Sequence, residues 1–81
     1  MNFSDLTFVD HPCIPGATQS VQAFPNGWQI SVVAGRGLHG TIGQDTFEVA
    51  VMEPKRGMVD DVLPWQTPAQ ITTILNLVRM L

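Results

Sequence analysis

The dipeptide Asn26-Gly27 constrains the fold of this chain more than any other feature. Asparagine and glycine both tolerate a positive φ, which a two-residue type I′ hairpin turn requires at its two central positions. The turn predicts three cross-strand pairs on one face of a hairpin: Val21 with Val32, Ala23 with Ile30, and Pro25 with Trp28. A shift of one residue would move every side chain of a strand to the other face. We therefore expect the turn to set the register.

Three segments alternate apolar and polar residues, as the strands of a half-buried sheet do. They are residues 18–24, 28–33 and 46–52, and together they predict an antiparallel meander over residues 18–52. Residues 58–63 favour either a fourth short strand or a turn. The apolar face of the meander is expected to carry Val21, Ala23, Trp28, Ile30, Val32, Phe47, Val49 and Val51.

A helix is predicted over residues 67–81. Thr67 and Gln70 have the spacing of a capping box, and Pro68 suits the first helical position. An apolar stripe at helical spacing follows, made of Ile71, Ile74, Leu75, Val78 and Leu81, with Leu77 and Met80 widening it. The helix should cover the apolar face of the sheet, since such a face must be buried.

The predicted fold class is therefore α+β: a single domain over residues 1–81, with a three- to four-stranded antiparallel meander sheet and one C-terminal helix on its apolar face. Residues 1–17 form an N-terminal arm or a short strand in this prediction. Pro12, Pro15 and Gly16 end whatever structure begins there.

The opposite face of the sheet is expected to be mixed, with an apolar patch formed by Phe24, Val33, Ala50 and Met52. Two interpretations stay open: the patch is an interface with a partner, or the N-terminal arm covers it. Trp65 also has two interpretations, as a core residue that staples the helix start or as an exposed anchor for a partner. The candidate interface residues are Phe24, Val33, Met52 and Trp65.

Composition narrows the class of partner. The net charge is −3, and the chain has four Lys and Arg residues, too few to neutralise many phosphates of a nucleic acid. Only 14% of the residues are charged and 44% are hydrophobic, which favours a homo-oligomer or a surface covered by a partner. A single cysteine, no transmembrane-length apolar run and no signal peptide predict a soluble protein of a reducing cytoplasm.

The metal and catalytic candidates are weak. His11, Cys13 and His39 lack the tight paired spacing of zinc ligands, so no metal site is expected and Cys13 is interpreted as a small buried residue. A nucleophilic site would have to form from neighbouring residues around Pro12, which is unfavourable. We expect no enzymatic activity and no cofactor.

Two acidic residues and one glycine-rich segment remain. Asp60 or Asp61 is expected to cap a short helical turn that begins at Val62. Residues 34–44 contain four glycines and predict a flexible hairpin loop, but their backbone N–H groups could also bind an anion. The candidate anion-binding residues are Arg36, Gly37, Lys55 and Arg56.

Several segments occur in a fixed order: Asn26-Gly27-Trp28, Ser31-Val32-Val33, Phe47-Glu48-Val49-Ala50-Val51, Asp60-Asp61-Val62-Leu63 and the helix from Pro68 to Leu81. Together they resemble a group of small, mostly uncharacterised bacteriophage proteins. The resemblance spans about two-thirds of the chain. The family pattern has tyrosine and glycine where this chain has Trp28 and Gln29.

The resemblance implies a phage protein that acts by binding and blocking a component of the bacterial host, such as an immune defence protein. One alternative is a homo-oligomer that sequesters a small anionic signal, such as a nucleotide, with Arg36 on its phosphate. A second alternative is an accessory protein of the virion or of its assembly.

Overall fold

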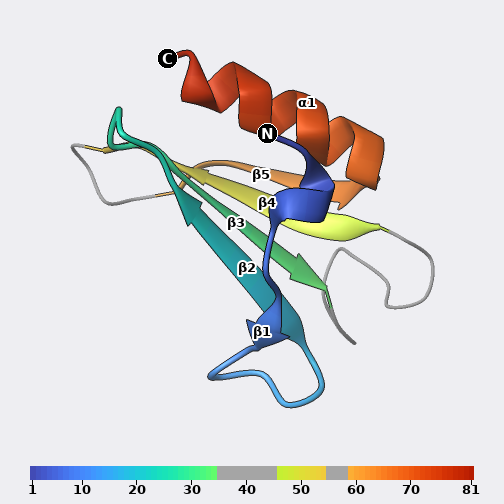
Figure 1. The fold of residues 1–81 in the computed structure, drawn as a ribbon. Coiled ribbons are helices and arrows are strands. Elements are labelled where there is room, and N and C mark those ends of the chain that lie inside the picture. The colour runs from blue at the N-terminus through green and yellow to red at the C-terminus, as the bar shows by residue number, and fades with distance from the viewer. Residues whose placement is uncertain (35–45, 55–58) are drawn as a thin grey trace.

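The protein forms a five-stranded antiparallel sheet with a C-terminal α-helix on one face, as the computed structural model shows (Figure 1). It describes residues 1–34, 46–54 and 59–81. The strands follow one another across the sheet in chain order, from β1 to β5. The elements are the 3₁₀ helix η1 (Phe3–Asp5), β1 (Val9–Asp10), β2 (Thr18–Ala23), β3 (Gln29–Ala34), β4 (Phe47–Met52), β5 (Val59–Gln66) and α1 (Pro68–Arg79).

The α+β class and the C-terminal helix are confirmed, whereas the sheet has five strands instead of three or four. The N-terminal arm supplies β1, and the segment before the helix supplies β5. Asp60 and Asp61 therefore lie within a strand, and the helical turn expected at Val62 is wrong. Val62 pairs with Ala50 of β4, because the backbone groups along the free edge of β4 form their hydrogen bonds with a fifth strand.

The helix starts as its sequence predicts. The Gln70 backbone N–H donates to Thr67 Oγ1 at 3.3 Å, and the Thr67 N–H donates to Gln70 Oε1 at 2.8 Å. This reciprocal pair satisfies two backbone donors that the first turn leaves without helical partners. Ile71 and Leu75 then lie fully buried, which stabilises the fold by about 1.5–3 kcal/mol for each side chain.

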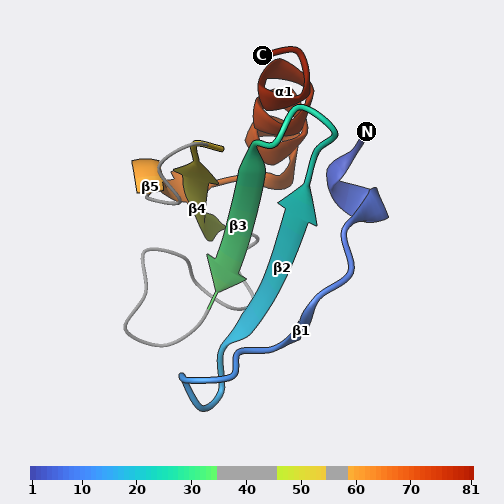
Figure 2. The same cartoon turned by 90° about the vertical axis from the view of Figure 1, so that its left-hand side faces the viewer.

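The core lies between α1 and the central strands β3 and β4 (Figures 1 and 2). The helix contributes three of its buried residues, and the two central strands contribute four. The buried cluster consists of Phe24, Ile30, Val32, Val49, Val51, Ile71, Leu75 and Val78. This agrees with the apolar face predicted for β3 and β4, and with the predicted position of the helix.

The N-terminal arm packs on the same side of the sheet as α1 (Figure 2). The ring centroids of Phe3, Phe8 and Phe47 lie 5.1–5.7 Å apart, the spacing of favourable aromatic pairs. The Phe3 N–H also donates to Thr72 Oγ1 of the helix at 2.9 Å. The arm therefore covers part of the core beside α1. The interpretation that it covers the opposite face of the sheet is wrong.

The β2–β3 hairpin has a three-residue loop, so the register expected from a type I′ turn is wrong by one residue. The Gly27 N–H donates to the Phe24 carbonyl and the Phe24 N–H donates to the Trp28 carbonyl, both at 2.9 Å. Gly27 has a φ of 91°, whereas Asn26 has no positive φ. This is the pattern of a type I turn followed by a left-handed glycine, for which Pro25 is a favoured second residue.

The change of register inverts the two faces of β2. Gln22 pairs with Ile30 and therefore shares its face. Val21, expected in the core, is 53% exposed, and Ala23 is exposed as well. Ser20 and Phe24, expected on the opposite face, are buried at 4% and 7% exposure. The polar side of β2 thus faces inward and its apolar side faces outward.

Asn26 binds the C-terminal end of α1 instead of supplying a positive φ. Its Nδ2 donates to the carbonyls of Val78 at 2.9 Å, Leu81 at 3.2 Å and Arg79 at 3.3 Å. Its Oδ1 accepts from the Trp28 N–H at 3.0 Å. The last carbonyls of a helix lack intrahelical partners, so this amide caps the helix and joins it to the hairpin.

We expect Asn26→Asp to lower the free energy of unfolding by about 1–3 kcal/mol. The aspartate keeps the acceptor for Trp28 but loses the N–H donors, and it sets a negative charge beside the negative end of the helix dipole. Urea unfolding followed by circular dichroism measures the change. Unfolding that is unchanged from the wild type would show that this cap contributes nothing.

Gly27→Ala should lower the free energy of unfolding by about 1–3 kcal/mol more than Gly16→Ala does. Both substitutions strain the backbone, but the Gly27 substitution also causes overpacking. A Cβ on Gly27 would lie 2.7 Å from Pro54 Cβ, whereas a Cβ on Gly16 would meet nothing within 4 Å. Both glycines have a positive φ, of 91° and 80°. Equal losses in thermal unfolding would contradict the predicted contact with Pro54.

Candidate docking surface

One face of the sheet is not covered by α1 or by the N-terminal arm. We call it the outer face. The strand pairings place these described residues on it: Val9, Gln19, Val21, Ala23, Gln29, Ser31, Val33, Glu48, Ala50, Met52 and Val62. All of them are exposed or partly exposed, in contrast to the buried valines and isoleucine on the helix side.

The middle of the outer face is uncharged and mainly apolar, and the rows on either side of it are more polar. Its central row crosses four strands through Val21, Ser31, Ala50 and Val62, and it carries no charge. Val21 is 53% exposed and Val62 is 42% exposed. The neighbouring rows add amide side chains and Glu48, the one charged residue among the described members of this face. An apolar centre with a polar rim is the usual anatomy of a protein–protein interface.

The predicted interface residues have different positions. Val33 and Met52 lie on the outer face and are partly buried, as their strands predict. Phe24 belongs to the core instead, so its expected place in the opposite patch is wrong, for the reason of register given above. Trp65 lies on β5 and is 54% exposed, which agrees with the interpretation as an exposed residue and not with that of a buried core staple.

The edge of the sheet at β5 is less suited to binding than the outer face. The opposite edge strand, β1, has only two residues and pairs with the first two residues of β2, so the rest of β2 has no strand partner on that side. The other edge strand, β5, contains Pro64 and an irregularity opposite Phe47 and Val49, and Trp65 there has a φ of 58°. Proline and bulges are devices by which natural sheets prevent strand addition at an edge.

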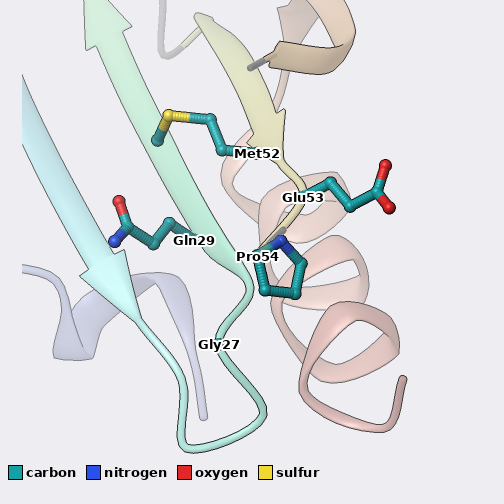
Figure 3. Close-up of a pocket in the computed structure, with 5 residues that line it drawn as sticks. All are labelled: Gly27, Gln29, Met52, Glu53 and Pro54. Carbon is teal, nitrogen blue, oxygen red and sulfur yellow. The ribbon is translucent and has the colours of Figure 1, made fainter. Parts of the chain in front are cut away.

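The candidate anion-binding residues Arg36, Gly37, Lys55 and Arg56 lie outside the described residues, so the anion site stays a prediction. A pocket of about 90 Å³ is lined by Gly27, Gln29, Met52, Glu53 and Pro54 (Figure 3). It is smaller than the roughly 300–1,000 Å³ of typical ligand sites. Among the described residues that line it, the charged one is the acidic Glu53.

Val21 and Val62 are the interface candidates that sequence reasoning missed. The exposure of Val21 could have been predicted from Pro25. Proline at the second position of a four-residue turn favours a type I turn, and the three-residue loop built on it turns Val21 outward. The signal for Val62 was the strand alternative for residues 58–63, which places Val62 and Leu63 on opposite faces. Both valines required the correct register before their exposure could be inferred.

His11 and Cys13 have structural positions in a turn. The backbone N–H groups of Cys13 and Ile14 donate to His11 Nδ1 at 3.0 and 3.1 Å. Cys13 is exposed, so its expected burial is wrong: the turn holds the residue outside the sheet. In the part of the chain that the structure describes, no three His, Cys, Asp or Glu side chains are grouped closely enough to hold a metal ion.

The chain matches no protein-family model, no curated protein and no solved structure. Among the described residues, no helix has the length and hydropathy required to cross a membrane.

Substitutions of Trp65 test its unusual backbone conformation. A left-handed conformation costs a residue with a side chain about 1–2 kcal/mol, and glycine avoids this cost. We therefore expect Trp65→Gly to be more stable than Trp65→Ala by about 1 kcal/mol. At an ordinary strand position the alanine variant would be the more stable of the two. Thermal unfolding of the two variants therefore tests whether residue 65 has a left-handed conformation.

Proposed function

We propose that this chain is a small, non-catalytic binding protein that docks on a protein of a bacterial host through its outer face and blocks that protein. One observation carries the proposal: an uncharged row of three apolar residues and Ser31 crosses four strands, and neither α1 nor the arm covers it. Exposed apolar patches on small proteins mark interaction sites. The resemblance to phage proteins supports a counter-defence role in the host cytoplasm.

A sheet face suits the blocking of another protein. The strands β2, β3 and β4 hold the central row through continuous backbone ladders, so little conformational entropy is lost when a partner binds. Val21 and Val62 mark the two ends of this row, and removing them from water supplies a favourable term that requires no matching charge. The amides of Gln19 and Gln29 flank the row and offer hydrogen bonds to a partner.

Sequestration of a small anion stays the second candidate, carried by Arg36 and the glycine-rich segment. Native mass spectrometry of the protein purified from a bacterial host separates the two candidates. A retained host protein supports docking. Added mass of nucleotide size that Arg36→Ala removes supports sequestration instead.

Charged substitutions on the outer face should abolish docking. We expect Val21→Lys and Val62→Lys each to weaken binding of the retained host protein at least tenfold, a loss of about 1.4 kcal/mol or more. A buried unpaired ammonium would be left in the complex. Both positions are exposed in the free protein, so its thermal unfolding should change little.

The matched control is Ser4→Lys, which adds the same charge at an exposed position of η1, on the helix side of the sheet. Titration calorimetry of the purified pair measures all three variants. Wild-type affinity in both valine variants would exclude the outer face as the docking site.

A further inference from the structure

The solvent side of α1 carries a second apolar surface, distinct from the outer face. Leu77 is 60% exposed and Met80 is 79% exposed, although both are large apolar residues. With Ala69 and Thr73 they form a stripe at spacings of four, four and three residues, which keeps them on one side of the helix. We call these four residues the helix stripe.

The helix stripe carries no charge, and covering it would leave no hydroxyl donor without a hydrogen-bond partner. Arg79 is the only charged residue of α1, and it is not part of the stripe. The Thr73 hydroxyl already donates to the Ala69 carbonyl at 3.3 Å. A partner that covers the stripe therefore removes apolar surface from water without leaving a hydroxyl donor unpaired.

The order of residue sizes along the stripe points to a partner. The N-terminal half has the small residues Ala69 and Thr73, and the C-terminal half has the large residues Leu77 and Met80. An antiparallel copy of the same helix sets the large half of one against the small half of the other. Such a two-fold contact uses one surface twice and is self-complementary. It also brings no like charges together, because the stripe has none.

We propose that two copies of this chain associate through the helix stripe, with their α1 helices antiparallel and Thr73 of each close to Leu77 of the partner subunit. The stripe is about 17 Å long at 1.5 Å per residue, so the interface is small and the dimer dissociates on dilution. Because the stripe and the outer face lie on opposite sides of the protomer, both outer faces stay available. The dimer would bind a host target in a bivalent manner.

Sedimentation equilibrium tests the association. The wild type should show a concentration-dependent monomer–dimer equilibrium at up to about 1 mM protein, where even a millimolar dissociation constant gives substantial dimer. Leu77→Lys and Met80→Lys should each weaken the dimer at least tenfold, whereas Ser4→Lys should not. A wild type that stays monomeric throughout this range overturns the proposal.

Cysteine cross-linking tests the antiparallel arrangement. In a Cys13→Ser background, the variants Thr73→Cys and Leu77→Cys are oxidised separately and as an equimolar mixture. The mixed disulfide should form in higher yield than either homodisulfide. Cross-linking of each variant only with itself would indicate parallel helices and overturn the arrangement.

Variants of the outer face separate this proposal from the proposed function. Val21→Lys should leave the dimer unchanged while it abolishes docking. Leu77→Lys should leave the monomer able to dock. Loss of the dimer in Val21→Lys, with the dimer retained in Leu77→Lys, would place self-association on the outer face and overturn the proposal.

Discussion

The amide of Asn26 joins the two halves of this fold. It donates to the last carbonyls of α1 and accepts from Trp28 in the β2–β3 hairpin, so one side chain fixes the helix end relative to the sheet. Gly27 follows with a positive φ and approaches Pro54 too closely for a side chain. The turn therefore has a definite shape, and because it sets the register of β2, it decides which residues of that strand reach solvent.

The surface of the protein follows from that register. Because the hairpin loop has three residues, Ser20 turns inward and Val21 turns outward. The inversion of β2 removes few apolar side chains from the core, since β3, β4 and α1 supply most of the buried residues. The outer face gains a valine at one end of its central row, and β5 supplies Val62 at the other end. A single added loop residue thus converts a mixed face into a more apolar one.

The two proposed contact surfaces lie on opposite sides of the protomer and have a common physical origin. In the part of the chain that the structure describes, α1 and the N-terminal arm cover one face of the sheet, and the sheet covers one side of α1. A chain of this size and low charge content leaves apolar area at its surface, and association covers it. The outer face suits a flat surface of a partner, whereas the helix stripe suits a second copy of α1.

The sequence alone determined the elements whose signals are local. The capping box of Thr67 and Gln70, the helical stripe of Ile71 and Leu75, and the alternation of β3 and β4 each depend on neighbouring residues. The register of β2, the pairing of β5 with β4 and the burial of Phe24 became definite only in the tertiary structure, although Pro25 favours the three-residue loop locally. Asn26 lies in the turn, as its sequence predicts, but its contact with α1, 52 residues away, leaves no local pattern.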